Sequence, residues 1–128
     1  LADDEVGRIV DLVTRLGLDG IIATNTTTSR HGLRTSAEAV AAAGPGGLSG
    51  PPVRARSLEV LRLIRARAPR LCVVSVGGVT SAADVAERLN AGASLVQGYT
   101  AFLYAGPLWV RQINRRLSRG ADGTWFAA

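Results

Sequence analysis

Three short apolar runs constrain the fold of this chain more than any other feature. The runs "GIIATN", "LCVVSV" and "SLVQG" do not alternate apolar with polar residues, a pattern typical of parallel strands that are buried on both faces. Segments with helical periodicity separate the runs. Strands that alternate with helices through right-handed crossovers form a parallel sheet with helices outside it. The sequence therefore predicts an α/β chain in the order α, β, α, β, α, β, α, α.

The predicted helices begin with residues that are typical of helix N-termini. Asp3 is expected to cap the first helix, and Ser81 and Asp84 are spaced as a capping-box pair at the start of "SAADVAERLNAG". A final helix is predicted from residue 106 to about residue 118. Three of its residues are expected to face inward: Val110, Ile113 and Leu117.

Two architectures fit this order of elements, a doubly wound open sheet and a (β/α) barrel. Three strands cannot close a barrel, so a barrel chain of this kind would be part of one, with unpaired sheet edges. Residues 1–118 are expected to form one structural portion, and residues 119–128 a flexible tail. Loops as long as the one over residues 25–56 tend to be functional or disordered, and this loop is expected to combine both tendencies, with a helical stretch near "SAEAVAAA".

Composition excludes some function classes. The chain has 15 basic and 10 acidic residues, and its arginines lie along predicted helices without interleaved aromatic residues, which favours solvated helix faces over a nucleic-acid site. The single cysteine, Cys72, lies inside a predicted strand and is expected to be a small buried apolar residue in a reducing compartment. No apolar run approaches the roughly 20 residues that span a bilayer, and no metal-ligand cluster is present.

Residues suited to a polar ligand follow all three predicted strands: Thr24-Asn25-Thr26, Gly77-Gly78 and Gly98-Tyr99-Thr100. Parallel strands place ligands at their carboxyl ends, where glycine backbone N–H groups can approach a phosphate. The alternative is that the glycines only permit tight turns, and that Asn25 begins an Asx turn. The convergence of three strand ends favours a phosphate site.

Catalytic groups are not evident in the chain. His31 lies in a polar loop without a partner, and Ser49 in "GLSG" does not match the G-x-S-x-G pattern of a nucleophile elbow. The sequence therefore assigns no catalytic residue, and the chemistry is expected to come from a cofactor or from residues outside this chain.

The motifs "IIATNTT", "GGLSGPP", "SVGGV" and "AGASLVQGYTAFLYAGP", in this order, resemble the C-terminal part of the class 2, quinone-linked dihydroorotate dehydrogenases. The resemblance runs from near residue 1 to about residue 118. It implies strands 6 to 8 of a (β/α)₈ TIM barrel that binds FMN. By motif, FMN contacts are implied for five residues: Thr24, Gly50, Gly78, Tyr99 and Thr100. Asn25 and Thr26 are implied to bind the carboxylated pyrimidine. The family often has serine in place of Thr100, and a hydroxyl is retained here.

The resemblance implies an oxidoreductase of pyrimidine biosynthesis that oxidises dihydroorotate to orotate, with FMN and a quinone as acceptors. The family's serine base, its lysine near the flavin and its membrane-facing helical extension would all precede residue 1. We therefore expect this chain alone to be soluble and inactive, with peripheral membrane association on the cytoplasmic side only through that extension. Two alternatives remain: another FMN- or phosphate-binding barrel, and a nonenzymatic half-barrel.

Overall fold

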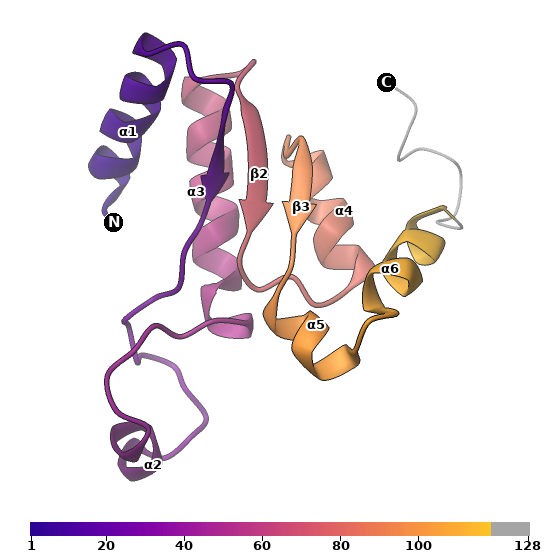
Figure 1. The fold of residues 1–128 in the computed structure, drawn as a ribbon. Helices are drawn as coiled ribbons and strands as arrows, with labels where there is room; N and C mark the ends of the chain where they lie inside the picture. Colours follow the sequence, from indigo (N-terminus) through magenta and orange to yellow (C-terminus); the bar gives the residue numbers. More distant parts are fainter. Residues whose placement is uncertain (119–128) are drawn as a thin grey trace.

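The computed structural model describes residues 1–118, and the predicted tail over 119–128 lies outside the described residues. The predicted order of helices and strands is confirmed, and so is the helical stretch in the long loop, which also contains a short 3₁₀ turn (Figure 1). The elements are α1 (Asp3–Arg15), β1 (Gly20–Ala23), α2 (Ala37–Ala42), the 3₁₀ turn η1 (Pro51–Val53), α3 (Arg54–Arg67), β2 (Cys72–Val76), α4 (Ala82–Asn90), β3 (Leu95–Gln97), α5 (Thr100–Ala105) and α6 (Trp109–Ser118).

The strands form a parallel sheet in sequential order, β1-β2-β3. Ile22 pairs with Val74, and Val74 pairs with Leu95, so the strands lie in register. Their carboxyl ends consequently meet at one edge of the sheet, where a parallel α/β sheet places its ligand.

Within residues 1–118, the helices cover only one face of this sheet. Val73 and Ile21 belong to the same apolar core as Leu61 of α3. Helix α1 packs against α3 (Figure 1). Val96 points to the same side and contacts the second apolar cluster, which α6 supplies with Trp109 and Ile113. A doubly wound sheet carries helices on both faces, so the described residues have the one-sided arrangement of a barrel wall.

The opposite face of the sheet is open, and the prediction that all three strands are buried on both faces is wrong for residues 1–118. Ile22 is 65% exposed and Leu95 is 61% exposed. Cys72 lies on this face and is exposed, so the prediction of a buried thiol is also wrong. The apolar runs have the composition of a sheet covered on both sides, but residues 1–118 supply a cover for only one.

Three predictions about the helices can be followed in the structure, and one of them is confirmed. Ser81 and Asp84 form the expected capping box. Helix α1 begins at Asp3 itself, so Ala2 occupies the N-cap, where its N–H donates to Glu5 at 2.7 Å. In α6, Val110 is 50% exposed because the indole of Trp109 takes the buried position beside it.

The long loop returns to the sheet because its two arms pair with each other. Thr27 and Leu48 exchange backbone hydrogen bonds of 3.0 and 2.7 Å. The predicted helical stretch is α2, whose first turn is capped by the Ser36 hydroxyl. This pairing brings the segment after Leu48 to the carboxyl ends of the strands.

None of the helices in residues 1–118 combines the length and the apolar character that a bilayer crossing requires.

Candidate functional site

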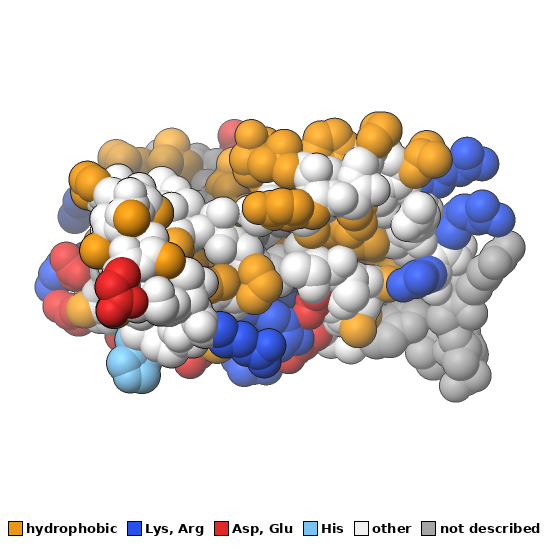
Figure 2. Space-filling model, turned by 90° about the horizontal axis from the view of Figure 1, so that it is seen from below, with side chains coloured by type: hydrophobic (Ala, Val, Ile, Leu, Met, Phe, Trp, Pro, Cys, Tyr) orange, Lys and Arg blue, Asp and Glu red, His pale blue; other side chains and the backbone are white. Residues whose placement is uncertain are grey.

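A hollow of about 390 Å³ lies at the carboxyl ends of the strands. Its volume falls within the range of small-molecule sites, roughly 300–1,000 Å³. Every residue to which the sequence assigned a ligand contact lines it: Thr24, Asn25, Thr26, Gly50, Gly78, Tyr99 and Thr100. Figure 2 shows the face of the molecule at the strand ends, where hydrophobic side chains gather along one side and clusters of Lys and Arg lie at the lower middle and at the right. The residues that line the hollow are all uncharged. The fold therefore brings together residues from β1, β2, β3 and the long loop.

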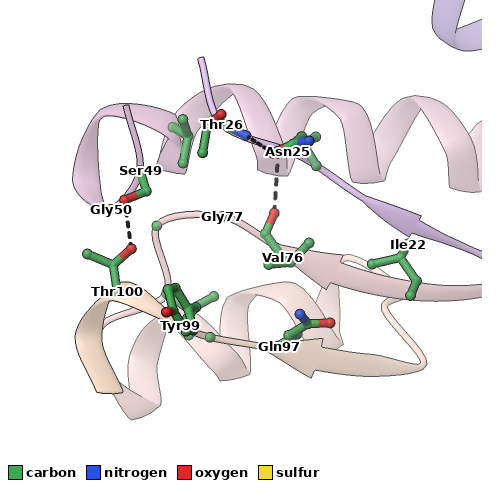
Figure 3. A pocket seen from close by; sticks show the side chains of 15 residues that line it. Ile22, Asn25, Thr26, Ser49, Gly50, Val76, Gly77, Gln97, Tyr99 and Thr100 are labelled. Atoms are coloured by element: carbon green, nitrogen blue, oxygen red, sulfur yellow. Dashed lines mark hydrogen bonds between the residues drawn. The ribbon is translucent and has the colours of Figure 1, made fainter. Parts of the chain in front are cut away.

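The β1 end supplies hydroxyl and amide groups. The Thr24 N–H and hydroxyl both donate to the carbonyl oxygen of Val76, at 2.8 and 3.4 Å, which continues the β1–β2 pairing into the site. The Asn25 Oδ1 accepts the Thr26 N–H at 2.7 Å (Figure 3). The Asn25 side-chain nitrogen donates to no atom of residues 1–118, which leaves two N–H donors for a ligand.

The β2 end turns sharply through Gly77 and Gly78, which have φ angles of 118° and 72°. A Cβ at Gly78 would lie 2.6 Å from the Arg54 Cα, so only glycine lets α3 begin this close to the turn. Gly78 therefore permits a tight turn, as the alternative interpretation of the glycines predicted. Within residues 1–118, the N–H groups of Gly78 and Val79 have no acceptor, so they are available to an anion.

The β3 end rests on Trp109. A Cβ at Gly98 would lie 2.5 Å from the Trp109 Cη2, so the indole packs directly beneath the strand end. The Trp109 Nε1–H donates to the Thr80 carbonyl oxygen at 3.1 Å. Trp109 therefore connects the β3 end to the turn that follows β2. Beyond Gly98, the N–H groups of Tyr99 and Thr100 donate to no oxygen in the described part of the chain.

The long loop closes the remaining side through Ser49 and Gly50. The Thr100 hydroxyl donates to the Ser49 Oγ at 2.9 Å (Figure 3). Sequence reasoning did not place Ser49 in the site, and it also missed Gln97, which lines the hollow from β3. The two-residue period of a strand would have found Gln97, because it lies on the same face as Leu95. The Ser49 contact has no comparable signal, since it depends on how the loop folds back.

A buried carboxylate fixes the turn behind Gly78. Asp84 accepts hydrogen bonds from Thr80 and Ser81, and its Oδ1 accepts the Arg54 Nε–H at 2.6 Å. Burial by itself raises the pKa of the Asp84 carboxyl. The hydrogen bonds from Thr80, Arg54 and Ser81 outweigh burial, so the pKa lies well below its ordinary value. Asp84 is therefore an ionised structural anchor outside the hollow.

The chemistry of the lining is that of a binding surface. The described residues around the hollow supply hydroxyls, one phenol, two carboxamides and backbone N–H groups, and they include no carboxylate, imidazole or thiol. His31 is exposed in the loop and does not line the hollow. Among residues 1–118, no group of three His, Cys, Asp or Glu side chains is arranged to hold a metal ion. Unpaired N–H donors fit the phosphate of a nucleotide such as FMN.

Both the sequence and the fold of this chain are similar to those of known proteins of one family. A family model described as dihydroorotate dehydrogenase matches residues 1–120. A Kocuria rhizophila protein named dihydroorotate dehydrogenase (quinone) is 64% identical over 94% of this chain and 34% of its own length. The Thermobifida fusca protein of the same name is 53% identical, over 100% of this chain and 34% of its own length. The crystal structure of the Eimeria tenella enzyme with ferulenol superposes with a TM-score of 0.81 at 34% identity, over 91% of this chain and 31% of that one. The chain spans about a third of the length of these relatives.

Proposed function

The chain belongs to the dihydroorotate dehydrogenase family, and we propose that its hollow forms part of the FMN and pyrimidine site of an enzyme that oxidises dihydroorotate to orotate, with a quinone as the final electron acceptor. The observation that carries the proposal is that the strand ends and the Ser49–Gly50 segment converge on one hollow. FMN, when bound, supplies the hydride-accepting chemistry. The residues of this chain bind and orient the reactants.

The phosphate of FMN is assigned to the two glycine-containing strand ends. The N–H groups of Gly78, Val79, Tyr99 and Thr100 have no acceptor among residues 1–118, and a phosphate accepts several such hydrogen bonds at once. Gly50, at φ 72°, brings bare backbone up to the same hollow. The donors that line the hollow are uncharged, and converging backbone N–H groups attract an anion because they carry the positive ends of their peptide dipoles.

The pyrimidine is assigned to Asn25 and Thr26. The Asn25 carboxamide is planar and offers two donors, which suits a flat ligand bearing carbonyl and carboxylate oxygens. Thr26 adds a hydroxyl beside it. Among residues 1–118, those that line the hollow include no suitable general base, so proton removal is assigned to the family's serine.

The open face of the sheet is assigned to further strands of the same barrel. Ile22, Val74 and Leu95 form a continuous row on this face, and apolar rows of this kind are buried in closed (β/α)₈ barrels. Quinone access and peripheral association with the cytoplasmic side of the membrane are likewise assigned to the family's N-terminal extension. Activity is therefore expected only when those parts are present.

Flavin titration tests the proposal. FMN fluorescence is measured against the purified chain and against Thr24→Val, which removes a hydroxyl from the hollow while keeping its volume. Thr28→Val, in the exposed loop outside the hollow, is the matched control. We expect weaker FMN binding for Thr24→Val alone, and equal binding by both variants would refute the assignment.

Orotate provides a separate test of the substrate half. Asn25→Ala should weaken orotate binding in the presence of FMN and leave FMN affinity unchanged, because the carboxamide is assigned to the pyrimidine. Loss of FMN affinity in this variant would contradict the division between cofactor and substrate residues. Failure of orotate to raise the melting temperature of the FMN-loaded protein would point to a different substrate.

A further inference from the structure

Arg88 is a buried cation at the back of the site. It comes from α4, is 2% exposed, and lies between that helix, α3 and β2. Its guanidinium donates to the Ser75 Oγ at 2.6 Å, to the Ser57 Oγ at 2.7 Å and to the Gly77 carbonyl oxygen. None of the ion pairs formed within residues 1–118 includes Arg88, and Arg54 takes both neighbouring acidic groups, Asp84 and Glu87. Burying a charge without a direct counter-ion is costly. The Arg88 guanidinium is therefore a candidate for a functional role.

The contact with Gly77 determines how the next N–H group is aimed. The Gly77 carbonyl and the Gly78 N–H belong to one planar trans peptide group, in which the two bonds point in opposite directions. Arg88 and Ser57 hold the carbonyl oxygen from the helix side of the sheet, the latter at 2.8 Å. The Gly78 N–H therefore points away from the guanidinium, on the side where Gly78 lines the hollow.

We propose that Arg88 is a positioning residue that aims and polarises the Gly77–Gly78 peptide toward an anionic phosphate ligand. This inference rests on the proposed function, because it takes the hollow to bind the phosphate of FMN. A cation on the carbonyl oxygen strengthens the N–H at the other end of the same peptide as a donor. The guanidinium charge itself also attracts the phosphate through a medium of low polarity. Arg88 thus serves the ligand without touching it.

The test compares FMN with riboflavin, which lacks the phosphate. The unmodified chain should bind FMN more tightly than riboflavin. Arg88→Gln, which keeps a donor but removes the charge, should lower FMN affinity about tenfold and leave riboflavin affinity unchanged. Arg88→Lys, which keeps the charge, should retain most of the preference for FMN. Arg62→Gln, an exposed arginine on α3, is the matched control and should change neither affinity.

A second measurement uses a variant that leaves the guanidinium in place. Ser75→Ala removes one anchor of Arg88, and it should lower the preference for FMN about threefold, a change in the range of one hydrogen bond. In amide NMR spectra, inorganic phosphate should shift the Gly78 N–H signal in the unmodified chain and shift it less in the Ser75→Ala and Arg88→Gln variants.

The possible outcomes separate the two proposals. A preference for FMN that survives in both Arg88→Gln and Ser75→Ala would overturn the role of Arg88 and leave the phosphate site intact. Equal losses of FMN and riboflavin affinity would overturn it as well, since they would indicate a purely structural role. If the unmodified chain shows neither a preference for FMN nor a Gly78 shift with phosphate, the phosphate site itself is wrong.

Discussion

Replacing Gly98 with alanine should drive the Trp109 indole out of its place beneath the β3 end. The added Cβ would lie 2.5 Å from Cη2 and 2.9 Å from Cζ3, whereas carbon atoms in contact normally stay about 3.5–4.0 Å apart. The indole is buried among Val79 and Ile113, and its Nε1–H is held by the Thr80 carbonyl. It therefore has little freedom to give way.

The magnitude follows from two contributions. Overpacking of a filled core costs about 1–3 kcal/mol, and loss of the indole hydrogen bond to Thr80 costs about 1 kcal/mol. We expect Gly98→Ala to lower the free energy of unfolding by about 2–4 kcal/mol. In a domain of this size the melting temperature should fall by roughly 10 °C.

Urea unfolding followed by tryptophan fluorescence and circular dichroism measures this change. Gly46→Ala is the matched control, because no atom of residues 1–118, apart from its chain neighbours, lies within 4 Å of the added Cβ, and its effect should stay within about 0.5 kcal/mol. Trp109→Phe shortens the ring, so the double variant should be less destabilised than the sum of the single variants. Equal stabilities for Gly98→Ala and Gly46→Ala, or strict additivity in the double variant, would refute the packing argument.

Three further predictions concern the anchors of the fold and site. The pKa of Asp84 is lowered in the folded state, so its contribution to stability is complete above its unfolded pKa, about 4, and is lost as the pH falls. Asp84→Asn should therefore flatten the plot of melting temperature against pH in the acid range. A slope equal to that of the unmodified chain would contradict this role of Asp84. Leu61→Ala, at 1% exposure, should cost about 2–5 kcal/mol in urea unfolding, whereas Leu16→Ala, at 61% exposure, should cost little; similar costs would contradict the described core. Thr100→Ser should keep FMN affinity and Thr100→Val should lower it, because only serine retains the hydroxyl that reaches Ser49. Equal FMN affinities for the two variants would show that this hydroxyl does not contribute to the site.

Much of the fold could be predicted from local patterns in the sequence. The apolar runs and the helical periods between them gave the order of elements and the parallel sheet, since both depend on residues only a few positions apart. The end of each strand then located the residues that line the hollow, because parallel strands bring their carboxyl ends to one edge. Ligand roles for Thr24, Asn25 and the glycines remain predictions.

Tertiary contacts decided the rest. Arg88 reads in the sequence as one more helical arginine, and only packing against Ser57, 31 positions away, makes it a buried support of the Gly77–Gly78 turn. Ser49 joins the site through Thr100, 51 positions away. The exposure of Ile22 could not be predicted from the sequence either. An apolar run indicates that a face of the strand is suited to burial, but it does not indicate which segment covers that face. Local periodicity is set by the chain's own geometry, whereas burial and long-range pairing depend on which distant surfaces fold back against it.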